Sequence, residues 1–269
     1  MTEQAPARTR DFATPILWLW QAGLRFGGAI DVGCAEGFFS LALAEMGPLR
    51  DAAILNIDAQ QEFAAPLAAI RDGIGGHFRI CAVGARDGGT IELYRGVHPY
   101  WSSVREPGDR YWAAHNGLCE GESVRVPLRT IDALVQETRL PGPYLLKLDV
   151  QGAERDALLG ARRTLADTAV VLVETLVEEF AAIHELLARA GFELFDLTQI
   201  HYVEADVLGW FYPMYLHSRY RDLRPVTLWN PALNEAALEM QRERHARVER
   251  KIAESLARLR AGRWPPLPA

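Results

Sequence analysis

The stretch GAIDVGCAEGFFSLALAEMG, residues 28–47, decides the fold of this chain. It begins with a short run of mostly apolar residues, which suits a buried strand, and continues into a turn that contains Gly33 and Gly37. Apolar residues at helical spacing follow from Phe38 and stop at Gly47, where glycine favours the end of a helix. A buried strand that turns directly into a helix predicts the first half of a βαβ unit.

Downstream of this unit, apolar runs continue to alternate with amphipathic stretches as far as residue 200. The expected strands are 52–59, 77–85, 90–96, 144–150, 169–176 and 192–198, and the expected helices are 61–73, 130–137, 153–167 and 178–191. Short apolar strands separated by helices predict a mainly parallel sheet that is covered on both faces. The fold class is therefore α/β and Rossmann-like.

Composition narrows the class of protein further. The chain has 269 residues with 29 Lys+Arg and 35 Asp+Glu, a formal charge of −6, so we expect no nucleic-acid partner. The three cysteines have no Cys-x-x-Cys spacing, which indicates reduced thiols rather than a zinc site or a disulfide framework. We find no secretory signal pattern and no apolar run of membrane-spanning length, and expect a soluble cytoplasmic protein.

The turn after the first strand is a candidate cofactor site. Small residues let a ligand approach the backbone, and the helix that follows offers free N–H groups. Counted from Gly33, a dinucleotide fingerprint needs glycines where Ala35 and Phe38 stand, so S-adenosylmethionine fits better than NAD. An ordinary glycine-rich turn is the alternative. The candidate cofactor-binding residues here are Asp31, Gly33, Cys34, Ala35, Glu36, Gly37 and Phe38.

A second candidate lies at the end of the next expected strand. Asp58, followed by Ala59, stands 27 residues beyond Asp31. A carboxylate at this place is suited to accept hydrogen bonds from both ribose hydroxyls of an adenosine ligand. A solvated aspartate at a strand end is the plainer interpretation, and the residue gains weight only together with the first turn.

The most informative stretch is YLLKLDVQGAERDALLGARRTL, residues 144–165. In a strand, Lys147 and Asp149 share one face, and two charges in a central apolar strand are costly unless they are paired or functional. Glu154 opens the next helix, and Glu174 stands at the end of the following strand. We expect these four side chains to converge on one cleft. A Lys147–Asp149 pair that only braces the sheet is the alternative.

At these residues the sequence resembles the FkbM family of S-adenosylmethionine-dependent methyltransferases. The resemblance rests on KLDVQGAERDALLGARRTL, with DVGCAEGFFSL before it and VLVETL after it, and covers residues 28–200. Further similar segments, in the same order, are AVGARDGGTIEL, WSSV and VPLRTIDALV. Gln151 stands where many members carry Glu, and Cys34 and Ala35 replace the more usual small pair. The resemblance implies a class I methyltransferase fold, a seven-stranded sheet with an antiparallel last hairpin, and methyl transfer to oxygen, often on sugars or natural products.

Aromatic residues gather in two segments, near 94–121 and 201–220, that we interpret as insertions forming a lid. Aromatic faces suit sugar rings or hydrophobic acceptors, although a secondary core is an equally open interpretation. Four histidines in these segments are further candidate bases: His98, His115, His201 and His217.

The expected organisation is a helical lead-in at 1–27, the methyltransferase domain at 28–230, and a C-terminal helix with a Pro-rich tail at 231–269. The terminal helix carries an apolar stripe of Val248, Ile252, Leu256 and Leu259, which packs on its own domain or joins a second subunit into a homo-oligomer.

The function we expect is O-methyl transfer from S-adenosylmethionine to a hydroxyl of a carbohydrate, glycan or natural product. Asp149 or Glu154 would act as the base, Lys147 would keep them ionised, and Glu174 would line the pocket. Asp149 also counts among the cofactor-binding candidates. No ligand set requires a divalent metal, although one is compatible with these carboxylates. The alternatives are a catalytically silent binding or assembly module and, third, a nicotinamide enzyme.

Overall fold

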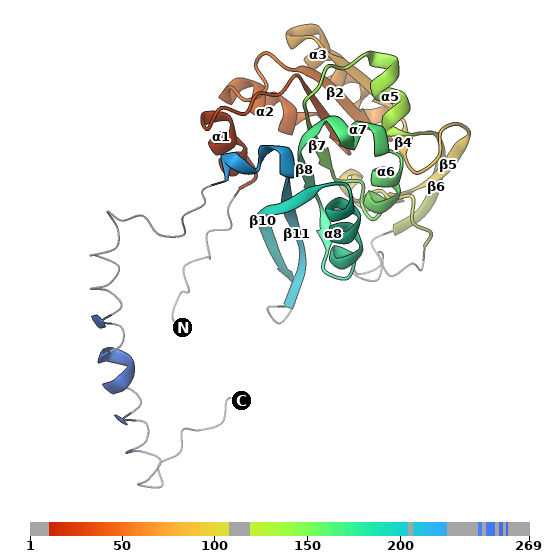
Figure 1. Ribbon diagram of the computed structural model, residues 1–269. Helices are drawn as coiled ribbons and strands as arrows, with labels where there is room; N and C mark the ends of the chain where they lie inside the picture. Colours follow the sequence, from red (N-terminus) through yellow and green to blue (C-terminus); the bar gives the residue numbers. More distant parts are fainter. Residues whose placement is uncertain are drawn as a thin grey trace. The chain divides into compact units, whose positions relative to one another are not determined.

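A computed structural model describes residues 11–107, 119–203 and 207–224, together with 242–243, 246–250, 253–254 and 257. The chain divides into two compact units, Met1–Leu223 and Arg224–Ala269. The first unit contains every helix and strand that carries a label in Figure 1.

The main sheet of the first unit runs in the order β10-β11-β8-β7-β1-β2-β3. Five neighbouring strands, from β8 to β3, pair in parallel, while β11 pairs antiparallel with both β10 and β8. This confirms a mainly parallel sheet that ends in an antiparallel hairpin; a short extra strand, β9, also pairs with β11. The strands are β1 (Gly28–Val32), β2 (Ala53–Asp58), β3 (His77–Ile80), β7 (Tyr144–Leu148), β8 (Thr168–Val173), β9 (Thr175–Leu176), β10 (Phe192–Val203) and β11 (Val207–His217).

Helices cover both faces of this sheet (Figure 1). One face packs on α5 (Ile131–Thr138), α6 (Glu154–Leu159), α7 (Arg162–Asp167) and α8 (Phe180–Arg189). The opposite face packs on α1 (Ala13–Gln21) and α2 (Phe38–Met46), and a third helix, α3 (Ala64–Ile74), follows the 3₁₀ turn η1 (Gln61–Phe63).

The alternation along β7 places its side chains as the sequence predicts. Leu146 and Leu148 enter the core beneath α5–α8, and Leu145 enters the core beneath α1 and α2. Lys147 lies on the α2 side, with its ammonium 5.8 Å from the ring centre of Phe39. The charged pair therefore occupies the face opposite Leu146 and Leu148.

A second, three-stranded sheet has the order β4-β6-β5 and corrects two expectations. The single strand expected at 77–85 is divided between β3 of the main sheet and β4 (Ala82–Val83) of the small one. Cys119–Arg129 forms the long strand β6, which pairs antiparallel with β5 (Thr90–Gly96) and was not expected. Residues 122–125 of β6 are exposed, so this strand lacks the apolar run by which a buried strand is recognised.

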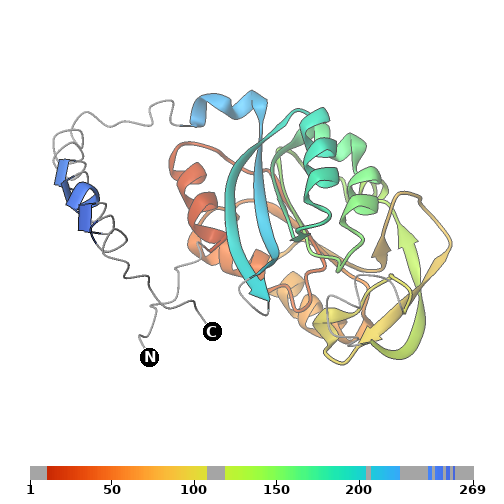
Figure 2. The same cartoon turned by 90° about the horizontal axis from the view of Figure 1, so that it is seen from below.

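The aromatic segment near 201–220 is not an inserted lid, contrary to our interpretation. Its described residues belong to the end of β10, to β11 and to the 3₁₀ helix η4 (Ser218–Leu223), and β11 lies inside the sheet between β10 and β8. Figure 2 shows the long strands β10 and β11 side by side. Tyr212 and Tyr215 are buried, because a central strand packs on both of its faces.

The expected helix at 153–167 is broken into α6 and α7 around Gly160. A Cβ atom at Gly160 would stand 2.1 Å from the carbonyl oxygen of Gly84, so the two backbones touch there and only glycine fits at the break. This is a tertiary constraint that helical periodicity does not reveal.

The terminal segments are described only in part. In the second unit, residues 242–243, 246–250, 253–254 and 257 are helical, and Val248 is exposed. Ile252, Leu256 and Leu259 of the expected stripe lie outside the described residues. Among the helices of the described part of the chain, none is long and apolar enough to cross a membrane.

Candidate active site

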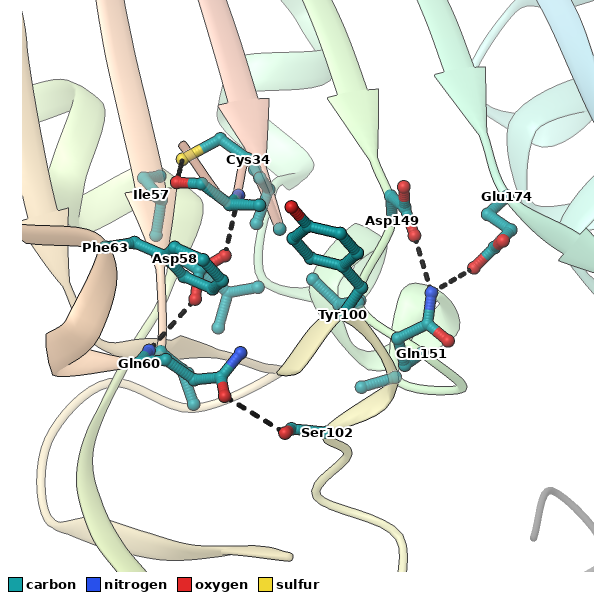
Figure 3. A pocket seen from close by; sticks show the side chains of 18 of the residues that line it. Cys34, Ile57, Asp58, Gln60, Phe63, Tyr100, Ser102, Asp149, Gln151 and Glu174 are labelled. Atoms are coloured by element: carbon teal, nitrogen blue, oxygen red, sulfur yellow. Dashed lines mark hydrogen bonds between the residues drawn. The ribbon is translucent and has the colours of Figure 1, made fainter. Parts of the chain in front are cut away.

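A cavity of about 380 Å³ opens at the carboxyl ends of β1, β2, β7 and β8 (Figure 3). Ligands of open α/β sheets bind at this edge, because the loops there diverge around the strand ends. The volume falls within the range of sites that enclose a small molecule or cofactor. The residues of the expected site that line it are Gly33, Cys34, Ala35, Glu36, Phe38, Asp58, Ala59, Lys147, Asp149 and Glu174.

The turn between β1 and α2 forms one wall, and its small residues have a local reason. Gly33 has a φ of +66°, and a Cβ there would stand 1.7 Å from the carbonyl oxygen of Asp149. Gly37, which does not line the cavity, has a φ of +81°, and a Cβ there would contact side chains of α3 and β2. Close packing with the protein itself therefore requires glycine at both positions.

Asp58, at the end of β2, is fixed by two backbone donors. Its Oδ2 accepts a hydrogen bond from the N–H of Ala35 at 2.9 Å, and its Oδ1 accepts one from the N–H of Gln60 at 2.9 Å. Burial raises the pKa of Asp58 to about 6, although these hydrogen bonds oppose the shift. Each carboxylate oxygen has a second lone pair, so the group retains the capacity to accept hydroxyl donors.

Lys147 lies at the floor of the cavity between two carboxylates. Its Nζ is 3.4 Å from Oδ1 of Asp31 and 3.3 Å from Oδ2 of Asp149, and it donates to the carbonyl oxygen of Gly33 at 3.1 Å. Burial lowers the pKa of Lys147, but the two carboxylates outweigh this effect and the net shift is upward, so the ammonium stays charged.

Asp31 does not line the cavity, although it was expected to bind the cofactor. Its side chain is only 1% exposed and lies behind Lys147. Burial raises the pKa of Asp31, and the Lys147 ammonium opposes that rise. The residue is therefore a buried counter-ion of Lys147 and does not contact a ligand in the cavity.

Glu154 also lies outside the cavity, which corrects its expected role as a base. Its Oε1 accepts hydrogen bonds from the N–H groups of Val150 at 2.9 Å and Gly152 at 3.2 Å, and its Oε2 accepts from Gly152 at 3.0 Å. Burial raises its pKa to about 7, against these hydrogen bonds. The carboxylate supports the turn after β7, where it cannot reach an acceptor.

Beside Lys147, four side chains form a closed hydrogen-bonded ring. Gln151 donates through Nε2 to Oδ1 of Asp149 at 2.8 Å and to Oε2 of Glu174 at 2.6 Å (Figure 3). The Tyr212 hydroxyl lies 3.0 Å from Oδ2 of Asp149 and 3.1 Å from Oε1 of Glu174. Burial raises the pKa of Asp149, but the Lys147 ammonium and the ring hydrogen bonds outweigh this effect and lower it. We call Asp149, Gln151, Glu174 and Tyr212 the carboxyl ring.

The turn that carries Gln151 is held from the small-sheet side. Gln151 itself has a φ of +55°, an uncommon conformation for a residue with a side chain. The Ser103 hydroxyl donates to the carbonyl oxygen of Gln151 at 2.6 Å, and Nε of Arg105 donates to that of Gly152 at 2.6 Å. These contacts hold the backbone in the conformation that aims Gln151 between the two carboxyl groups.

Aromatic side chains border the opening of the cavity. Phe38 lines it and is 76% exposed. Tyr100 stacks on Phe63 with ring centres 6.1 Å apart, and its hydroxyl donates to Oε1 of Glu36 at 2.8 Å. Trp101, next to it, is also exposed and lines the cavity. Tyr100 and Trp101 of the segment near 94–121 thus contribute aromatic surface to the site, and residues 108–118 of that segment lie outside the described residues.

Sequence reasoning missed three contributors to the site. Tyr212 was covered only as part of the aromatic segment near 201–220, and Gln60 and Phe63 were not noted at all. Tyr212 is 63 residues from Asp149 along the chain, and no local pattern distinguishes it from the other tyrosines of its segment. A signal for Gln60 and Phe63 did exist, since residues just after a β2 aspartate necessarily border the same strand end.

Of the candidate histidines, His98, His201 and His217 do not line the cavity, and His115 lies outside the described residues. Within the described ranges we find no cluster of three or more His, Cys, Asp or Glu side chains able to hold a metal ion.

A Rossmann-like sheet with an antiparallel last hairpin, a glycine turn after β1 and an acidic end to β2 together define a class I S-adenosylmethionine-dependent methyltransferase fold. The methyltransferase FkbM domain matches residues 32–194, more than half of the sequence. The chain belongs to this family.

Solved structures with a similar fold are distant in sequence. One is methyltransferase FkbM from Methylobacillus flagellatus KT, which is 16% identical in sequence. The match covers 76% of this chain and 48% of that chain, with a TM-score of 0.46. Precorrin-6y C5,15-methyltransferase from Geobacter metallireducens GS-15 has 10% identity, coverages of 80% and 94%, and a TM-score of 0.38. Streptococcus pneumoniae Sp1610, a putative tRNA (m1A22) methyltransferase, has 9% identity, coverages of 94% and 89%, and a TM-score of 0.41.

The matched part therefore spans about half the length of the Methylobacillus protein. No curated protein matches the sequence.

Proposed function

We propose that this protein transfers a methyl group from S-adenosylmethionine to a hydroxyl oxygen of a carbohydrate, glycan or natural-product acceptor. The observation that carries the proposal is the position of Asp149. Its carboxylate lies in the cavity, 21% exposed, beside a charged Lys147 that keeps it ionised. An ionised carboxylate at this place can accept the proton that a hydroxyl loses as its oxygen is methylated.

The donor and acceptor groups of the cavity fit S-adenosylmethionine. Asp58 presents fixed carboxylate oxygens with free lone pairs for the two ribose hydroxyls. Ala59, Phe63 and Ala82 line the same part of the cavity and offer apolar surface to an adenine ring. The turn from Gly33 to Phe38 and the first N–H groups of α2 suit the carboxylate of the methionine portion.

S-adenosylmethionine, when bound, supplies an electrophilic methyl group on a sulfonium sulfur. The chain's own residues then act by alignment and by charge. The Gly33 turn and Asp58 hold the donor against the strand ends, so the acceptor oxygen has to approach from the open side of the cavity. Asp149 takes the hydroxyl proton on a carboxylate oxygen, and Lys147 stabilises the ionised form before the transfer. No described residue set calls for a metal in this step.

The rim of the cavity supports the proposed class of acceptor. Phe38, Tyr100 and Trp101 present aromatic faces beside the opening, and such faces pack on the apolar faces of sugar rings and on hydrophobic ring systems. A net charge of −6 supports a neutral small molecule or glycan rather than nucleic acid. A cytoplasmic location and a homo-oligomer formed through the C-terminal helix remain predictions.

Two experiments test the proposal. Calorimetry should show micromolar binding of S-adenosylhomocysteine and no binding of NAD or ATP; preferential binding of NAD would contradict the assignment. Methyl-labelled S-adenosylmethionine should then be incubated with a panel of glycans and hydroxylated natural products. Label recovered as a methyl ether in nuclear magnetic resonance spectra supports O-methylation, whereas label found only on nitrogen or carbon contradicts it.

A further inference from the structure

The carboxyl ring contains one hydrogen fewer than its contacts require if both of its acids are ionised. Gln151 has two N–H hydrogens on Nε2, one for each of its contacts with the two carboxyl groups, so that side of the ring is complete. With the amide carbonyl facing the carboxyl groups instead, only the Tyr212 hydrogen would serve the four contacts, and two carboxyl groups cannot supply the three protons that would then be missing. The amide orientation is therefore set by its neighbours.

On the other side of the ring, Tyr212 faces two carboxyl oxygens with a single hydroxyl hydrogen. Its oxygen lies 3.0 Å from Asp149 and 3.1 Å from Glu174, both of which are hydrogen-bond distances. If Tyr212 donates to one acid, the other contact needs a hydrogen that only a protonated carboxyl group can supply. The ring therefore holds one additional proton.

The surrounding charges decide which acid carries that proton. Lys147 on β7 lies 3.3 Å from Asp149, whereas no ion pair to Glu174 is found among the described residues. The ionisable groups that act most strongly on Glu174 are the acids Asp149 and Glu154 and the hydroxyl of Tyr212 on β11, none of which is a cation. Burial and then the Asp149 charge raise the pKa of Glu174 well above its usual range.

We propose that Glu174 is a carboxylic acid at neutral pH, that it donates its proton to the Tyr212 oxygen, and that Tyr212 in turn donates to an ionised Asp149. The number of hydrogens in the ring follows from its geometry alone. Only the consequence for catalysis, that Asp149 and not Glu174 acts as the base, rests on the proposed function. Glu174 is then a hydrogen donor that cannot serve as the base. Tyr212 and Gln151 are positioning residues, which hold the Asp149 carboxylate by its two oxygens beside Lys147.

The test is infrared spectroscopy of the purified full-length protein without cofactor, at pH 8. This pH lies above the value of about 7 to which burial raises the pKa of Glu154, so a protonated Glu154 contributes little. The wild type should show a protonated-carboxyl stretch that is absent from Glu174→Gln. The substitution keeps the shape and the hydrogen donor of a neutral acid, so the fold should survive. Identical spectra for the two proteins would overturn the proposal.

A second variant tests whether Tyr212, and not burial alone, interacts with the protonated Glu174 carboxyl group. In Tyr212→Phe the Glu174 band should persist but move to higher frequency, because the carboxyl group loses the oxygen to which it donates. An unmoved band would overturn the assignment of Tyr212. In Asp149→Asn the band should titrate at lower pH, because the neighbouring charge is gone and an amide N–H can supply the missing hydrogen.

Turnover gives a further readout once an acceptor is known. The acid limb of the kcat profile should move to higher pH in Tyr212→Phe, since Asp149 loses a donor to its ionised form, while the KM of the acceptor changes little. An unmoved acid limb would contradict the positioning role. The infrared result needs no cofactor and no acceptor, so a failure of the methyltransferase assignment and a failure of the ring assignment are distinguishable.

Discussion

Replacement of Asp149 by asparagine distinguishes a catalytic role of this residue from a purely structural one. The contacts of Asp149 determine how much stability the variant should lose. The substitution removes one of the two carboxylates around Lys147, but the ammonium keeps Asp31 at 3.4 Å and the carbonyl oxygen of Gly33 at 3.1 Å. No buried charge is left alone. We therefore expect a loss of about 1–3 kcal/mol in the free energy of unfolding, as for one charged hydrogen bond.

Lys147→Met is the matched comparison, because it removes the cation and leaves both carboxylates. Asp31 is 1% exposed and would then be an uncompensated buried charge, which costs about 3–5 kcal/mol. For a domain of this size, that corresponds to a fall in Tm of roughly 10 °C. Without the ammonium, which opposes the effect of burial, the pKa of Asp31 in the folded state is raised further than in the wild type. The native state then binds more protons, and the deficit should shrink as the pH falls.

The assays are thermal unfolding, calorimetric titration with S-adenosylhomocysteine, and methyl transfer on the same preparations. For Asp149→Asn we expect a folded protein that still binds the cofactor product, with kcat lowered about 10²-fold or more. A variant that loses as much stability as Lys147→Met yet keeps its specific activity would refute the reasoning and make Asp149 a brace. Normal stability with full activity would remove it from both roles.

Three further predictions use other parts of the site. Asp58→Ala should weaken the binding of S-adenosylhomocysteine by about 1–3 kcal/mol in calorimetry. Because the pKa of Asp58 is raised to about 6, wild-type affinity should fall as the pH drops through that value and stay constant in the variant. Gly33→Ala should lower Tm strongly, since its Cβ would overlap the Asp149 backbone, whereas the control Gly73→Ala meets no atom within 4 Å and should stabilise α3 by about 0.5–1 kcal/mol. Truncation after Pro231 should leave cofactor binding intact in calorimetry, and light scattering should show the mass halved if the terminal helix joins subunits.

Much of the fold follows from the sequence because the parallel strands are buried on both faces. Such strands read as unbroken apolar runs, and β1, β2, β7 and β8 were all expected near their actual bounds. The shared face of Lys147 and Asp149 follows from the period of two along a strand. Those same rules could not find β6, since its residues 122–125 face solvent, nor the break at Gly160, where the chain touches the Gly84 backbone.

The site was harder to predict than the fold. Candidate residues after β1, β2, β7 and β8 do meet at one edge, because parallel topology brings strand ends together. Asp31 and Glu154 were expected to contact ligand, but the sequence does not say that one lies beneath Lys147 and the other folds back onto a turn. Tyr212 enters from an antiparallel strand, so its alignment with Asp149 depends on the register of β11 against β8. No pattern along the chain encodes that register.

The hydrogen bonds from Ser103 and Arg105 to the turn after β7 have a consequence for the redesign of acceptor specificity. The segment around them carries Tyr100 and Trp101, so it is the natural place to graft a new acceptor preference. Yet the same segment donates hydrogen bonds to the carbonyl oxygens of Gln151 and Gly152, and these bonds fix the orientation of the Gln151 amide. A loop exchange that omits these two hydrogen bonds would alter the chemistry together with the specificity. Grafts that replace only residues 97–101 and leave 102–105 in place should change what is recognised without disturbing how it reacts.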